Sequence, residues 1–166
     1  MTRPPGPPWA DSGLGNHSGT INGGATFVAG RFGNAIQLSS SSSQYVSMGD
    51  IYNFTGTPGE NFSITAWVKT TATTAEIVAG RHDSGSFNGY FLAINSGSGY
   101  GAANTAYFYP SGPPGETPVS GATINDGQWH LLAGRMLGGN AAIFVDDGGA
   151  TQINGVNAPN SRPRPS

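Results

Sequence analysis

The chain has 166 residues, which is enough for one domain with a sizeable core and too few for two domains of ordinary size. Its 27 glycines, the absence of cysteine and a charged fraction of only 10% indicate a turn-rich all-β protein, and exclude disulfides and thiolate metal sites. The formal charge is −2 and the seven Lys and Arg residues are scattered, so no stripe could neutralise successive phosphates and we expect no nucleic-acid partner.

The two ends of the chain are Pro-rich. Because proline has no backbone N–H to donate, we expect residues 1–10 and 157–166 to be extended or disordered, leaving residues 11–156 as the folded domain. The first residues lack the apolar segment of a signal peptide. No stretch is long and apolar enough to cross a bilayer, so membrane insertion is not expected.

Short strand candidates lie between clusters of Gly, Ser, Pro and Asn. They are residues 25–28, 35–38, 45–48, 62–69, 76–80, 90–95, 106–109, 128–135 and 141–145. Nine short strands are too many for one open sheet of this size to bury, so two packed antiparallel sheets are predicted. No segment has helical periodicity over three turns, and helix should be negligible.

The clearest alternation is in residues 62–69. One face would carry Phe62, Ile64, Ala66 and Val68, and the other would carry Ser63, Thr65, Trp67 and Lys69. The apolar face should enter the core between the sheets. Trp67 would then point outward, where its ring is either covered by a loop or available to a ligand.

A second candidate for ligand binding is the segment 81–89, predicted to be a loop. It holds a cation, a histidine, an acid and an amide at Arg81, His82, Asp83 and Asn88. Loops on a rigid sandwich commonly carry binding groups, and sugar sites combine an aromatic ring with a few polar side chains. The alternative is an ordinary polar hairpin connection.

The two apolar runs that flank Gly138-Gly139-Asn140 predict a β-hairpin. Trp129 and His130 are expected to be scaffold residues of this hairpin, and Asp146-Asp147 would lie at its end. The three histidines, His17, His82 and His130, have no Ser, Cys or acidic partner at a spacing typical of a catalytic triad.

Several segments together resemble the laminin G-like members of the concanavalin A-like lectin/glucanase superfamily. They are residues 11–20, 30–38, 43–46, 62–69 and 126–130. The resemblance implies a jelly-roll sandwich. The ends depart from the family pattern, because no strand with Trp and an acid precedes Asp11, and nothing after Gly148 resembles the usual final strand. We therefore expect atypical or truncated ends, with the last strand missing.

The resemblance also implies a calcium site built from an Asp in the first loop, loop carbonyls and acids of the final strand. Here Asp11 would supply a carboxylate, and Asn16 and His17 would supply carbonyl oxygens. Since the final-strand acids are missing, Ca²⁺ binding should be poor. The alternative is a glycine-rich loop with an Asx turn.

Three functions remain open. The first is a non-catalytic recognition or adhesion module of a larger exported protein, secreted or at the cell surface, that binds a glycan or an extracellular protein surface. The second is a glycoside hydrolase or lyase domain, which would need Glu76 and Glu116 to converge within about 10 Å. The acids are far apart in the sequence, so no enzyme is expected. The third is a structural spacer without a ligand, and exposure of Trp67 would favour the first function over it.

Overall fold

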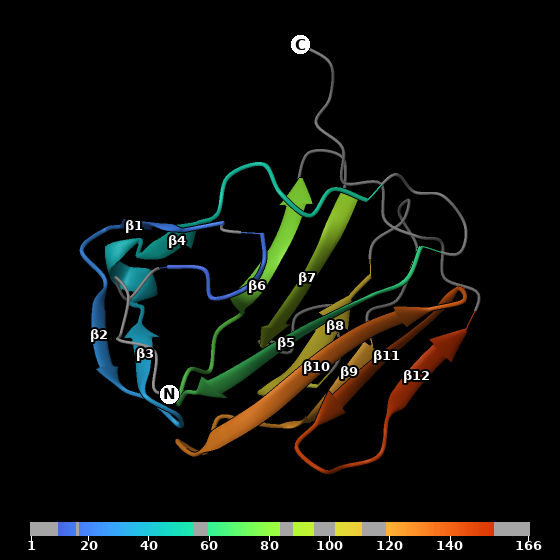
Figure 1. The fold of residues 1–166 in the computed structure, drawn as a ribbon. Helices are drawn as coiled ribbons and strands as arrows, with labels where there is room; N and C mark the ends of the chain where they lie inside the picture. Colours follow the sequence, from blue (N-terminus) through green and yellow to red (C-terminus); the bar gives the residue numbers. More distant parts are fainter. Residues whose placement is uncertain are drawn as a thin grey trace, which may run out of the picture. The chain divides into compact units, whose positions relative to one another are not determined.

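The computed structural model describes residues 10–15, 17–54, 60–83, 88–94, 102–110 and 119–154 (Figure 1). Over these residues the chain forms twelve β-strands and one 3-10 turn at Ser40–Ser42, and no α-helix. No helix in this part of the chain is long and apolar enough to span a membrane. Two compact units, residues 1–52 and 53–166, divide the chain and are described separately.

The first unit consists of two antiparallel ribbons. Its strands are β1 (Thr20–Asn22), β2 (Thr26–Ala29), β3 (Asn34–Gln37) and β4 (Tyr45–Ser47). β1 pairs with β4, placing Ile21 opposite Val46, and β2 pairs with β3, placing Phe27 opposite Ile36. None of the described hydrophobic side chains of this unit is fully buried. Two-stranded ribbons have little surface on which to build a core.

The second unit is a sandwich of two four-stranded antiparallel sheets (Figure 1). The first sheet, in spatial order, is β12 (Thr151–Asn154), β11 (Asn140–Val145), β10 (Trp129–Leu137) and β5 (Phe62–Lys69). The second sheet is β6 (Glu76–Asp83), β7 (Asn88–Ile94), β8 (Thr105–Tyr109) and β9 (Val119–Thr123). The predicted all-β, two-sheet jelly-roll sandwich is confirmed.

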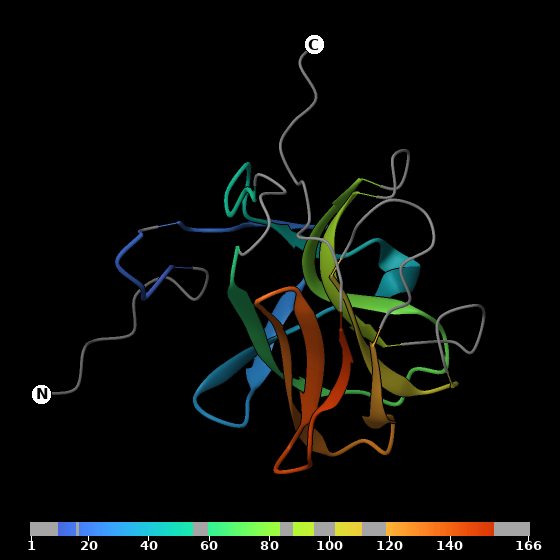
Figure 2. The same cartoon turned by 90° about the vertical axis from the view of Figure 1, so that its right-hand side faces the viewer.

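The hydrophobic core lies between these two sheets, whose strands form separate layers in Figure 2. Its buried side chains come from both sheets: Leu92, Ile94, Ala106, Phe108, Ile124, Leu132, Met136, Ala141, Ile143 and Val145. In β5 half-buried and exposed side chains alternate along the whole strand, with Phe62 and Ile64 packed against the core. The alternation predicted for residues 62–69 is therefore confirmed, and Trp67 points outward.

Three glycines explain details of the sandwich: one lets the sheets approach, and two form a hairpin turn. Gly134 of β10 faces Phe108, and a Cβ at that position would collide with the ring, so only glycine allows the sheets to approach this closely. Gly138 and Gly139 join β10 to β11 with φ angles of 56° and 76°. Both angles are positive, as a type I′ hairpin turn requires, which confirms the hairpin predicted there.

Three strands were not predicted, namely β1, β9 and β12. Each is only three to five residues long and is composed mainly of polar or small residues, so alternation is too short to detect. β12 follows Gly148 and pairs with β11, in a segment where the sequence had indicated no strand. The other strands match their predicted positions within a few residues at either end.

Candidate functional site

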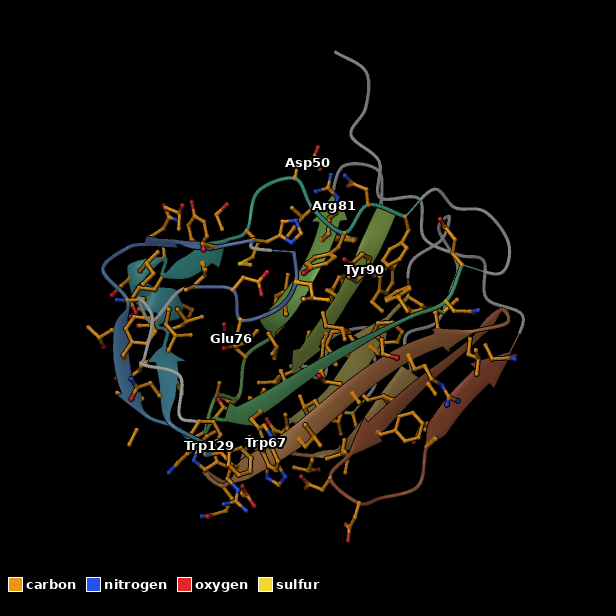
Figure 3. The ribbon with its side chains drawn as sticks, viewed as in Figure 1. Asp50, Trp67, Glu76, Arg81, Tyr90 and Trp129 are labelled. Carbon is orange, nitrogen blue, oxygen red and sulfur yellow. The ribbon has the colours of Figure 1, made fainter. Side chains whose placement is uncertain are left out.

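Trp67 lies on the outer face of the first sheet, with 39% of its surface exposed. It stands opposite Leu131 of β10, and Lys69 stands opposite Trp129. Residues opposite each other in an antiparallel pair share a face, as do residues two apart along a strand. The two tryptophans therefore lie diagonally on one face, where β5 ends and β10 begins (Figure 3). We call Trp67, Trp129 and Leu131 the tryptophan strip.

The tryptophan strip combines three apolar side chains with polar neighbours. Thr65 of β5 lies on the same face beside Trp67, and Lys69 extends the face beyond it. The apolar face of an aromatic ring suits the apolar side of a ligand. The hydroxyls of the same ligand can then bind polar side chains around the ring. The sequence predicted Trp67 as a ligand residue, but gave no sign that Trp129 lies beside it, because this depends on the register between distant strands.

The segment 81–89 is not a loop throughout. Arg81, His82 and Asp83 belong to β6, where Arg81 stands opposite Tyr90, His82 opposite Gly89 and Asp83 opposite Asn88. Gly89, with φ of 117°, lets the two backbones approach so closely that a Cβ would collide with the carbonyl of Arg81. This close pairing extends the strand three residues beyond its predicted end. The side chains of Asp83 and Asn88, and residues 84–87, lie outside the described residues.

His82 faces an aromatic cluster on the outer side of the second sheet. Its ring centre is 4.9 Å from that of Phe91 and 5.6 Å from that of Tyr109, edge to face in both cases. Phe91, Ala93, Tyr107 and Tyr109 are all buried. Arg81, one residue away in β6, points to the other face of the strand. Because Trp67 and His82 lie on the outer faces of opposite sheets, the two predicted ligand regions do not form one site.

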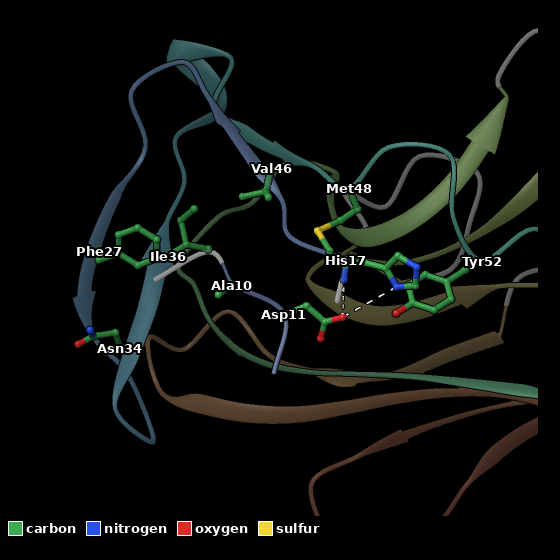
Figure 4. A pocket seen from close by; sticks show the side chains of 9 residues that line it. All are labelled: Ala10, Asp11, His17, Phe27, Asn34, Ile36, Val46, Met48 and Tyr52. Carbon is green, nitrogen blue, oxygen red and sulfur yellow. Dashed lines mark hydrogen bonds and ion pairs between the residues drawn. The ribbon is translucent and has the colours of Figure 1, made fainter. Parts of the chain in front are cut away.

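Asp11 and His17 lie together in the first unit (Figure 4). Oδ1 of Asp11 accepts a hydrogen bond from the Gly13 N–H at 2.6 Å, and Oδ2 accepts one from the His17 N–H at 2.7 Å. These backbone donors, His17 first and Gly13 second, lower the pKa of Asp11 below its ordinary value. The ring Nδ1 of His17 is 3.9 Å from Oδ2. Asn16, the third residue predicted at this site, lies outside the described residues.

The hydrogen bonds of this loop occupy the carboxylate that a calcium site would use. Calcium takes six to eight oxygen ligands, but both oxygens of Asp11 already accept backbone N–H groups that close the loop. No group of three or more acids and histidines suited to a metal occurs among the described residues. The same residues line a pocket of about 290 Å³ whose other walls are largely apolar, including Phe27, Ile36 and Met48 (Figure 4). The hydrogen bond from the Gly13 N–H to Asp11 is that of an Asx turn, which was the alternative to a calcium site at this loop.

His130 is held between two carboxylates, which the sequence did not reveal. Its Nδ1 is 2.8 Å from Oδ2 of Asp146, and its Nε2 is 3.0 Å from Oδ1 of Asp126. A carboxylate only accepts hydrogen bonds, so both ring nitrogens must carry a proton to satisfy both contacts. The sequence shows no triad spacing around His130, and its two acidic partners become evident in the fold. Asp126, four residues before His130, was the only local signal, since Asp146 is brought close by the pairing of β10 with β11.

These contacts shift the pKa of all three groups. The hydrogen bond that His130 donates to Asp146, and then the one that it donates to Asp126, raises the pKa of His130 above its ordinary value of 6.5 against the opposing effect of burial. The hydrogen bond from His130 lowers the pKa of both aspartates, with smaller help from the backbone N–H of Gln128 at Asp126 and of Leu131 at Asp146. We call these three residues the histidine clamp. It joins the turn before β10 to the turn after β11.

Of the two acids that a hydrolase would need, the structure describes Glu76. Glu76 begins β6 and its Oε1 accepts a hydrogen bond from Thr74 at 3.0 Å. Glu116 lies outside the described residues, so the convergence with Glu76 that a hydrolase would need is not tested.

Two antiparallel sheets around one core, with an outward tryptophan strip, define a lectin-like β-sandwich. The model of the family Laminin_G_3, described as the concanavalin A-like lectin/glucanases superfamily, matches residues 40–163. The chain belongs to this family. None of the curated proteins matches it.

Proposed function

We propose that the chain is a non-catalytic recognition module that binds glycans through the outer face of its first sheet. In this proposal it acts outside the cell, secreted or at the cell surface, as part of a larger protein. The observation that supports it best is the outward position of Trp67, exposed on a face that also carries Trp129 and Leu131. A pyranose has one apolar side, which such rings cover well, and hydroxyls that reach the polar neighbours.

The state of the acids supports a non-catalytic role. Glycoside hydrolases of the common kind need one carboxylic acid with a raised pKa as the proton donor, beside a second carboxylate. In the described part of the chain, Asp126 and Asp146 lie on either side of the His130 ring. Both have a lowered pKa because each accepts a hydrogen bond from His130. Both are therefore ionised near neutral pH, and neither can protonate a leaving group.

A glycan array with the intact chain tests the proposal, run with calcium and with a chelator. We expect binding in both conditions, and Trp67→Ala should reduce it by about tenfold or more while unfolding remains cooperative. The control is Phe32→Ala, which removes an aromatic side chain that is 71% exposed in the turn between β2 and β3 and should leave binding unchanged. If no glycan binds in either condition, or Trp67→Ala changes stability alone, the module is a spacer and the proposal fails.

A further inference from the structure

The outer face of the first sheet is positively charged, although the chain as a whole has a formal charge of −2. Strand register places the following described side chains on this face: Ser63, Thr65, Trp67, Lys69, Trp129, Leu131, Ala133, Arg135, Leu137, Asn140, Ala142 and Phe144. Two of them, Lys69 and Arg135, are cations, and no acid occurs among them. The face therefore combines aromatic surface with charge of one sign.

Lys69 stands beside Trp129 at one end of the tryptophan strip, and Arg135 lies four residues beyond Leu131 at the other end. Lys69 pairs with Trp129 at the start of β10, and Arg135 lies six residues farther along that strand. At about 3.3 Å per residue this separation is roughly 20 Å. Trp67 and Leu131 occupy the row next to Lys69. A linear ligand that runs along the strands would meet Lys69 and Trp129 in one row, Trp67 in the next, and Arg135 two rows farther on.

Arg135 is held in a defined position. Its guanidinium carbon lies 5.2 Å from the ring centre of Phe144, its neighbour on β11. Its Nε is buried and makes no hydrogen bond within the described part of the chain. A guanidinium resting on an aromatic ring keeps its flat geometry, and its fork of N–H donors matches the two oxygens of a carboxylate.

The two acids nearest this face, Asp126 and Asp146, are partly neutralised by His130. Asp146 follows β11 and would be the next residue of the face, but its carboxylate turns to Nδ1 of His130 at 2.8 Å. Asp126, before β10, binds the other ring nitrogen at 3.0 Å. His130 carries a positive charge when it makes both contacts, so it offsets much of their negative charge.

We propose that this face binds a linear acidic polysaccharide whose sugar rings lie on Trp67 and Trp129 and whose uronate carboxylates meet Lys69 and Arg135. The inference rests on the proposed function and names the class of glycan. A neutral polysaccharide would gain the ring contacts alone. A carboxylate-bearing chain adds attraction at both ends, which dissolved salt screens.

Two forms of one polymer provide the test, namely polygalacturonate and its fully methyl-esterified form, which has the same backbone without the charge. Calorimetry with the intact chain at about 0.01 M and 0.15 M ionic strength should give at least tenfold tighter binding of polygalacturonate at low salt, and a smaller difference at higher salt. Lys69→Gln and Arg135→Gln should each weaken this binding several-fold. Trp67→Ala should weaken the binding of both forms.

Arg31→Gln is the matched control. Arg31 lies 5.3 Å from the ring centre of Phe32, the same kind of contact that Arg135 makes with Phe144, but it belongs to the turn between β2 and β3 in the first unit. Its replacement removes an equal charge and should change affinity by less than twofold. Arg135→Lys keeps the charge and should retain more affinity than Arg135→Gln, which decides the role of Arg135 if the glutamine variant folds poorly.

The outcomes separate this inference from the proposed function. Equal binding of the charged and esterified polymers, or an equal loss with Arg31→Gln and Lys69→Gln, overturns the acidic class while glycan binding stands. Binding of dextran sulfate without binding of polygalacturonate also overturns the inference, because the face would then select sulfate groups and not uronate carboxylates. If neither polymer binds and the glycan array is blank, both proposals fail.

Discussion

The two compact units of the chain bury their apolar side chains very differently. In the second unit Leu92, Phe108 and Leu132 are completely buried between two sheets. In the first unit Val28 and Phe32 are exposed, and none of the described hydrophobic side chains reaches full burial. Similar strand patterns in the sequence thus lead to a core in one unit and to open ribbons in the other.

The first unit relies on polar contacts where the second relies on packing. The side chain of Gln44 accepts a hydrogen bond from the Ser39 N–H at 2.8 Å and donates one to the Gly23 carbonyl at 3.1 Å, which ties two turns together. Asp11 organises its own loop in the same way. Net contributions of such bonds are about 1 kcal/mol each, while a buried aromatic side chain contributes several times more. Most of the stability should therefore reside in the second unit.

Truncating one phenylalanine in each unit tests this contrast directly. Phe108→Ala removes a ring with no exposed surface from the core and should cost about 3–5 kcal/mol. Phe27→Ala removes a half-buried ring from β2, where no core closes around it, and should cost about 1–2 kcal/mol. Urea unfolding followed by circular dichroism measures both. Equal losses would show that the first unit depends on burial as much as the second does.

The contact between Gly134 and Phe108 gives a second, smaller effect. Gly134→Ala places a methyl group against the ring and should destabilise the sandwich by about 1–3 kcal/mol through overpacking. Phe108→Leu makes room at the same point, so the double variant should lose less than the sum of the two single variants. Strict additivity in this cycle would mean that the methyl group finds space elsewhere.

The same contrast explains what could be predicted from the sequence. Within residues 62–69 the period of two was enough to give the strand, its inward face and the outward position of Trp67, because all of these are local properties. The neighbours Trp129 and Leu131 could not be predicted, since they depend on how β10 aligns with β5. His130 and Asp146 are likewise joined by strand pairing across sixteen residues. The alternation of apolar and polar residues along a strand also does not show whether other strands bury the apolar side of a ribbon such as β2 and β3.

The histidine clamp gives the second unit a pH dependence. The raised pKa of His130 adds stability that is complete below about 6.5 and is lost as pH rises through the folded-state value. The lowered pKa values of Asp126 and Asp146 add stability that is complete above about 3.8 and is lost as pH falls through their folded-state values. Stability should therefore be greatest between about pH 4 and 6.5.

Asp146→Asn tests the clamp. Because Asp146 is 40% exposed, its loss should cost about 1 kcal/mol or less, seen as a fall of a few degrees in Tm. Above pH 6.5 the stability of the variant should also fall much less than that of the unchanged protein. His130 can be followed directly by the NMR titration of its ring, whose midpoint should fall in the variant. An unchanged midpoint would mean that Asp146 does not hold the proton on His130.

The smallest effect should come from calcium at the loop of Asp11 and His17. Because both oxygens of Asp11 accept backbone N–H groups, we expect a Kd of 1 mM or weaker. Addition of 1 mM Ca²⁺ would then stabilise the protein by less than about 0.4 kcal/mol, which is below one or two degrees in Tm. Magnesium serves as the control for a general effect of divalent ions. Micromolar affinity for Ca²⁺ by calorimetry would contradict this, and would mean that the loop exchanges its internal hydrogen bonds for the ion.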